Sequence, residues 1–179
     1  MKKAKSSGSI ILLLLLLVIS ANAQEKGQIG LVIGYPASVG FRWNVGGNFA
    51  IRPDVAFTKS SGVSTFSFSQ ESYSFETGLS ALLYVKKWEN VSAYVTPRIS
   101  YIRSKSNNGA FVGASVPGVN WSYLGSASFG AEYNLNRKFS VFGEVGVAYT
   151  RFHSGSTFSV TPLTKTWNSK SGVGINLYF

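Results

Sequence analysis

The chain has 179 residues, of which 45% are hydrophobic, 15% aromatic and 13% charged, and it contains no cysteine. This length suffices for one domain, and the missing cysteines exclude disulfides as a source of stability. The formal net charge is +10, but the basic residues are dispersed, which argues against a nucleic-acid surface. One histidine and no cysteine leave no metal-ligand cluster, and no glycine-rich phosphate motif is present, so we expect no cofactor.

The first 23 residues have the pattern of a secretory signal peptide. Three lysines lie within the first five residues, and 10–19 is an apolar run that is too short to span a bilayer as a helix. Ala21-Asn22-Ala23 offers the small residues that a signal peptidase reads. We expect cleavage after Ala23 and one exported domain over 24–179. An uncleaved membrane anchor is the alternative, and the length of the apolar run disfavours it.

The exported domain alternates apolar and polar residues with a period of two, with the apolar residues at odd positions. Because successive side chains of a strand point to opposite faces, each alternating segment predicts a strand with one apolar face. The eight segments are 28–35, 39–45, 49–58, 73–85, 91–101, 121–135, 139–150 and 167–179. Each has about ten residues, the length with which a tilted strand crosses a bilayer.

The connections between these segments differ in length. Short turns are expected at 36–37, 46–48, 86–90 and 136–138, and long loops at 60–71, 104–120 and 153–165. Short turns at one end and long loops at the other are typical of membrane barrels. The fold class expected is therefore all-β: an eight-stranded antiparallel transmembrane β-barrel preceded by a cleaved signal peptide.

The even positions distinguish this barrel from a soluble, lipocalin-like one, which would keep apolar side chains inside. They hold almost no large aliphatic residues but four charges of each sign: Arg42, Arg52, Asp54, Glu76, Arg98, Glu132, Glu144 and Lys170. An eight-stranded barrel is only wide enough for side chains, and buried charges are costly unless paired. We expect a static, paired charge network that fills the lumen. A gated ion path, in which the pairs exchange partners, is the alternative.

The aromatic residues separate into two belts, as at the two interfaces of a membrane barrel. Those expected at the long-loop ends are Tyr35, Tyr73, Tyr101, Trp121, Tyr123, Tyr149 and Trp167. Those expected at the turn ends are Trp43, Phe49, Trp88, Tyr133, Phe139 and Phe179.

The sequence resembles the bacterial outer-membrane β-barrel domain family, of the small eight-stranded OmpA/OmpX type. Three features carry the resemblance: the signal peptide with Ala-Gln at its junction, the unit from Ala131 to Tyr149, and the ending VGINLYF. The resemblance implies an outer-membrane location, in a bacterium with two membranes, with the long loops outside the cell. It also implies an assembly signal for the barrel-assembly machinery, carried by Val173, Ile175, Leu177 and Phe179.

Two further groups bear on function. His153 lies near Ser154 and Ser156, but a catalytic triad needs a carboxylate that orients the base, and Glu71 alone could reach it. We therefore expect no catalytic residues. The outer rim is basic and could hold phosphates or sugars of lipopolysaccharide, or remain merely solvated. Its residues are Lys59, Arg103, Lys105, Arg151 and Lys165.

From these patterns we expect a monomeric barrel with a structural or surface-interaction role. It would contact membrane lipids and lipopolysaccharide, and its loops would meet an extracellular ligand. A porin-like small-solute or ion channel is the second hypothesis, and a lipid-modifying enzyme is the third.

Overall fold

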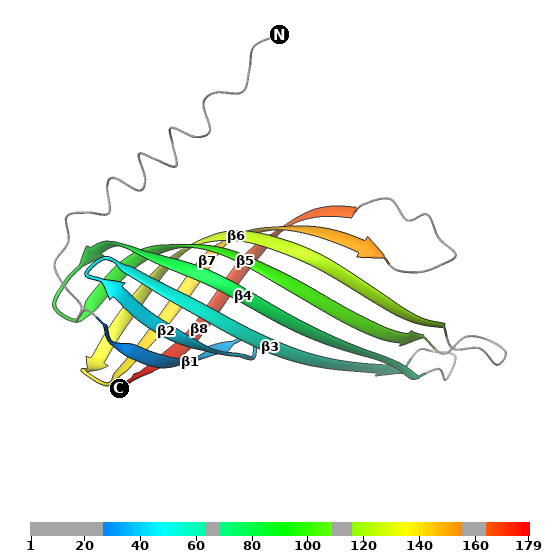
Figure 1. The fold of residues 1–179 in the computed structure, drawn as a ribbon, viewed down its shortest axis with the longest axis horizontal. Helices are drawn as coiled ribbons and strands as arrows, with labels where there is room; N and C mark the ends of the chain where they lie inside the picture. The colour runs from blue at the N-terminus through cyan, green and yellow to red at the C-terminus, as the bar shows by residue number, and fades with distance from the viewer. Residues whose placement is uncertain (1–26, 64–68, 109–115, 155–163) are drawn as a thin grey trace, which may run out of the picture.

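The computed structural model describes residues 27–63, 69–108, 116–154 and 164–179, which form eight antiparallel strands closed into a barrel. Each strand pairs with the next in chain order, and β1 pairs with β8 (Figure 1). The strands are β1 (Ile29–Tyr35), β2 (Ser38–Gly46), β3 (Phe49–Val63), β4 (Ser69–Lys87), β5 (Val91–Asn108), β6 (Val116–Asn136), β7 (Phe139–Ser154) and β8 (Thr164–Tyr178). This fold confirms the predicted fold class, while the predicted signal peptide lies outside the described residues. Within the described ranges, no helix is long and apolar enough to cross a membrane.

The register of the ladder fixes the tilt of the strands. Starting from Val55 on β3 and moving from each residue to its paired residue on the next strand, one reaches Lys165 on β8. Moving instead through β2 and β1, one reaches Ile175, so the ladder closes with a displacement of ten residues. With ~3.3 Å per residue and ~4.8 Å between strands, this displacement corresponds to a tilt of about 40°, as in membrane barrels.

The wall has the inverse polarity of a soluble protein. Odd residues point outward, and the side chains of Ile99 and Val145 are 68% and 63% exposed. Even residues point into the lumen, where Arg42 and Glu132 are each 1% exposed. An exposed apolar band around a buried, charged interior is stable only when lipid surrounds the band.

Most strands are longer than the predicted ten residues. β4, β5 and β6 contain 19, 18 and 21 residues, so the predicted loops at 60–71, 104–120 and 153–165 were too wide. The extra pairs join small polar residues, such as Ser60 with Ser72 and Ser74 with Ser104. Backbone hydrogen bonds hold these pairs together, and no apolar alternation marks them in the sequence.

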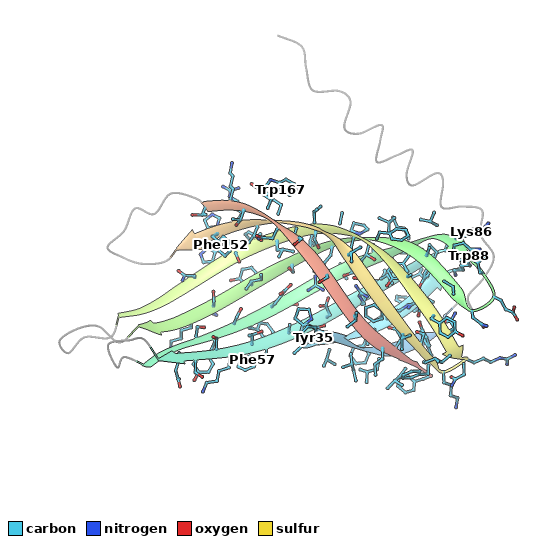
Figure 2. The ribbon with its side chains drawn as sticks, turned by 180° about the vertical axis from the view of Figure 1, so that it is seen from behind. Tyr35, Phe57, Lys86, Trp88, Phe152 and Trp167 are labelled. Carbon is cyan, nitrogen blue, oxygen red and sulfur yellow. The ribbon has the colours of Figure 1, made fainter. Side chains whose placement is uncertain are left out.

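The β1–β2 hairpin is shorter than the rest of the wall. β1 has 7 residues, which cover about 18 Å of barrel height at this tilt. Its last residue, Tyr35, pairs with Val173 and lies near mid-height (Figure 2). The prediction that Tyr35 belongs to the outer aromatic belt was wrong, because the turn at Pro36-Ala37 ends the hairpin early.

Above this hairpin the wall has a lateral notch. Residues 57–63 of β3 pair only with β4, and residues 164–172 of β8 pair only with β7. No other described strand lies between these two edges.

An arginine scan along β7 tests the orientation of the wall. We expect Val145→Arg to destabilise the barrel by about 2–4 kcal/mol, because it places a charge in the lipid near the midplane. The measurement is the free energy of unfolding by denaturant in phospholipid vesicles. Val141→Arg, on the same face near the turn end, should cost about 0–1 kcal/mol. Equal costs at the two positions would contradict this placement.

Candidate functional site

The carboxylate of Glu132 is buried in the lumen and is surrounded by hydrogen-bond donors. Arg42 Nη1 lies 2.8 Å from Glu132 Oε1 in an ion pair whose side chains are 1% and 0% exposed. The other donors to this carboxylate are Tyr84 Oη (3.1 Å), Ser140 Oγ (2.5 Å), Asn176 Nδ2 (2.9 Å) and Tyr178 Oη (2.7 Å). Buried charges are tolerated when they are paired and hydrogen-bonded, and this Glu132 cluster meets both conditions.

The buried rings of three tyrosines, Tyr84, Tyr94 and Tyr178, surround the Glu132 cluster. We call the cluster and these rings the closed layer. Tyr84 and Tyr94 pack edge to face with their ring centroids 5.6 Å apart, and both are buried. The Tyr84 hydroxyl also accepts a hydrogen bond from Arg42. A Cβ at Gly130 would lie 2.5 Å from the ring of Tyr94, so the glycine provides the space that this ring occupies. The lumen is therefore filled at this end of the barrel, where the short turns after β2, β4 and β6, the start of β1 and the end of β8 lie (Figure 1).

Two further ion-pair groups lie closer to the loop end. Arg52 Nη1 lies 2.8 Å from Glu144 Oε1, which also accepts a hydrogen bond from Tyr94 Oη at 3.0 Å. Arg98 binds two carboxylates, with Nη1 2.6 Å from Asp54 Oδ2 and Nη2 2.8 Å from Glu76 Oε1. A Cβ at Gly78 would lie 2.5 Å from this guanidinium, so Gly78 leaves room for the arginine.

The eighth residue of the expected network, Lys170, makes no ion pair with the described carboxylates. It lies half-buried within electrostatic range of Asp54, Glu76, Arg98 and Glu144. All of these groups line a cavity of about 150 Å³ above the closed layer. The structure therefore brings all eight residues into the lumen, seven of them in direct ion pairs.

Sequence reasoning missed the polar residues that complete the closed layer. Tyr84, Tyr94 and Tyr178 occupy even positions, which the alternation assigns to the lumen. Their large rings stand out among the small residues at the other even positions, and this contrast could have predicted a layer that fills the lumen. Ser140 and Asn176 gave none, because serine and asparagine are common at even positions throughout the chain.

The rest of the outer aromatic belt surrounds the loop end. Tyr101 and Trp121 each pack on Tyr123, and Tyr149 packs on Trp167, with centroids 5.1–5.6 Å apart. Figure 2 shows Trp167 and Phe152 at this end, and Trp88 and Lys86 at the opposite one.

The groups considered for catalysis are engaged in other contacts. Glu71 accepts a hydrogen bond from Tyr73 and lies 3.5 Å from Lys59 Nζ. The Tyr73 hydroxyl and the Lys59 ammonium lower the pKa of Glu71 below its ordinary value. His153 stacks on Trp121 with centroids 3.8 Å apart. Among the described residues there is no contact between His153 and Glu71 and no group that could hold a metal ion.

The four residues of the expected assembly signal occupy the last positions of the chain. Val173, Ile175 and Leu177 alternate along β8 and pair with Gly143, Val141 and Phe139 of β7. Phe179 is exposed, and its amide donates to the carbonyl of Ile29 at 3.0 Å. Recognition of these residues by the assembly machinery stays a prediction.

Replacing Glu132 tests how much the closed layer contributes to the free energy of unfolding. We expect Glu132→Ala to cost about 3–5 kcal/mol, because it removes the carboxylate that neutralises the buried Arg42. The double variant Arg42→Met/Glu132→Leu should recover only part of this loss, because it removes both charges but still takes the acceptor from Ser140 and Tyr178. Denaturant unfolding in lipid vesicles measures both effects. Glu71→Gln, at an exposed pair, is the control and should change stability little, and an equal loss there would contradict the assignment.

No family model matches the chain, and no curated protein matches it. Among solved structures, a major outer membrane protein from Thermus thermophilus is similar with a TM-score of 0.62 and 12% identity, covering 87% of this chain and 100% of that one. Ail of Yersinia pestis, in complex with the heparin analogue sucrose octasulfate, has a TM-score of 0.49, 13% identity and coverage of 87% and 100%. CarO of Acinetobacter baumannii has a TM-score of 0.42, 12% identity and coverage of 89% and 100%.

At these identities the likeness concerns the fold, and the fold agrees with the outward apolar band and the charged lumen. The chain therefore has the fold of a small, eight-stranded outer-membrane β-barrel.

Proposed function

We propose that this protein is a non-conducting outer-membrane barrel with a structural and surface-interaction role. The observation that supports this function best is the closed layer at the turn end. Five of its side chains, from different strands, are at most 2% exposed: Arg42, Tyr84, Tyr94, Glu132 and Asn176. An ion that entered from the loop end would have to displace this whole layer, with its paired charges, to pass through.

The geometry of the network also favours a static role over a gate. Glu132 accepts hydrogen bonds from five side chains that lie on four other strands, β2, β4, β7 and β8. Exchange of partners would leave several of these donors unpaired in a buried site, and each costs about 1–3 kcal/mol. A porin-like channel is therefore the less favoured hypothesis.

The surface role is supported by the loop end of the wall. β4, β5 and β6 extend beyond the apolar band, so the residues at their loop ends lie clear of the bilayer. Lys59, Arg103, Lys105, Arg151 and Lys165 are exposed on the outward side of this extension, and we call them the basic belt. Lys59 is in register with Tyr73 and Tyr73 with Lys105, so cations alternate with rings.

Such a belt fits the anionic groups of the outer surface. Each Lys or Arg near an anionic lipid surface contributes about 1 kcal/mol of attraction, and neighbouring rings contact the apolar border of the membrane. We propose lipopolysaccharide phosphates as the partner of the basic belt, with the loops free to contact an extracellular ligand. Enzymatic activity forms no part of this proposal.

Conductance tests the closed lumen. In planar bilayers the purified protein should give no discrete current steps, because the Glu132 cluster closes the lumen. Arg42→Ala/Glu132→Ala should produce steps if the variant retains the heat-modifiable gel mobility of a folded barrel. Steps in the unaltered protein whose ion selectivity changes on Glu132→Gln would reject the proposal and favour the channel.

Affinity for lipopolysaccharide tests the basic belt. With all five cations replaced by Gln, we expect binding to purified lipopolysaccharide to weaken at least tenfold and to lose most of its salt dependence. Titration in detergent at two salt concentrations gives both quantities. Replacing Lys86, Arg137 and Lys138 at the turn end is the matched control and should leave the affinity unchanged. Equal losses in both variants would indicate unspecific charge attraction.

A further inference from the structure

Among the eight described strands, the lateral notch leaves backbone polar groups of two unpaired at the depth of the membrane. The edges of β3 and β8 above the hairpin carry backbone N–H and C=O groups that no described strand pairs. Unpaired backbone at this depth is tolerated only where it is buried in protein or lines a hydrated space. On β8 the outward residues directly above the hairpin tip are Ser169 and Ser171, both exposed, while Trp167 of β8 and Phe57 of β3 lie further up the two edges. Polar groups therefore reach down to the tip of the hairpin.

Inside the notch lies the polar cavity of about 150 Å³ above the closed layer. Its charges balance, but one oxygen of Asp54 and the ammonium of Lys170 are left without a partner among the residues that the structure describes. Asp54 is 7% exposed, and its Oδ1 accepts no hydrogen bond within the described part of the chain. Lys170 makes no ion pair there. A ligand that satisfies both groups must combine an anionic oxygen with a hydrogen-bond donor, and a net charge of zero preserves the balance.

Outside the notch a groove of about 360 Å³ runs over the lipid-facing wall. Phe129, Ala131, Gly143 and Val145 form the part beyond the notch, and all four are apolar or glycine. The cavity and the groove share Tyr35, Glu144, Ser171, Gly172 and Val173, which lie where the hairpin tip meets β8. The polar cavity and the apolar groove therefore meet at the notch.

We propose that the notch binds a phospholipid with an ethanolamine headgroup. The headgroup lies in the cavity, and one acyl chain lies on the outer face of the wall. The phosphate pairs with Lys170 in the cavity, and the ammonium donates to Asp54 Oδ1. One acyl chain follows the groove past Gly143 toward the turn end. The headgroup carries one charge of each sign, so it satisfies both unpartnered groups without disturbing the ion pairs of Arg52 and Arg98. This site is independent of whether the lumen conducts and of the basic belt.

Two glycines provide a matched pair of variants for the groove. A Cβ added at Gly143 or at Gly125 meets no atom within 4 Å, so neither position is closed to a side chain at its Cβ. Gly143 lies in the proposed groove, whereas Gly125 lines a different hollow on the outer wall, beside Ile99 and Val147. Leucine at Gly143 fills the path of the acyl chain, and leucine at Gly125 leaves it open.

Titration of the folded protein in detergent with lyso-phosphatidylethanolamine tests the proposal. We expect saturable binding of one lipid per barrel. Gly143→Leu and Lys170→Met should each weaken it at least tenfold, while Gly125→Leu and Lys170→Arg should retain it. Gel mobility with and without heating verifies that each variant is folded.

Two further probes identify the ligand chemistry. Lyso-phosphatidylcholine, whose headgroup has no N–H donor, and phosphoethanolamine, which has no acyl chain, should each bind at least tenfold more weakly. Equal affinity for either probe, an unaltered affinity in Gly143→Leu, or absence of saturable binding would overturn the proposal.

Discussion

The structure depends on one constraint: a backbone that faces lipid must satisfy its own hydrogen bonds. A sheet meets this constraint only by closing, because an open edge leaves a row of unpaired donors and acceptors in a medium without water. Here the closure is the pairing of β1 with β8, from Gly30 with Tyr178 to Tyr35 with Val173. With eight strands and a displacement of ten residues, that closure also sets the width of the lumen.

A lumen of this width explains the chemistry inside it. The side chains must fill the space, and buried charges are costly unless paired, so seven of the eight charged residues lie in direct ion pairs. The Glu132 cluster is the extreme case, since one carboxylate accepts hydrogen bonds from five side chains. Glycines at Gly78 and Gly130 make these large polar groups fit, because any side chain there would meet Arg98 or Tyr94.

The short β1–β2 hairpin is the place where closure is incomplete. Seven residues of β1 close the lower part of the wall, and the edges of β3 and β8 continue above it without a neighbouring strand among the described residues. The side chains adapt to this gap: serines replace apolar residues on the outward face of β8, and the cavity behind them retains an unpaired lysine and an unpaired carboxylate oxygen. The same constraint that closes most of the barrel thus makes the notch a site for polar groups.

The number of strands, their antiparallel order and the polarity of the wall can all be predicted from the order of the residues. These follow from an alternation that each strand carries locally, and so does the lumen position of all eight charged residues. Which charges pair depends on the folded barrel, because partners such as Arg42 and Glu132 are brought together by the register of strands that are distant in sequence. The folded barrel also decides the depth of Tyr35 and the existence of the notch, since the level a hairpin reaches depends on its neighbours. The strand ends that are built from paired serines could not be predicted either. Backbone hydrogen bonds stabilise them, and no hydrophobic period marks them in the sequence.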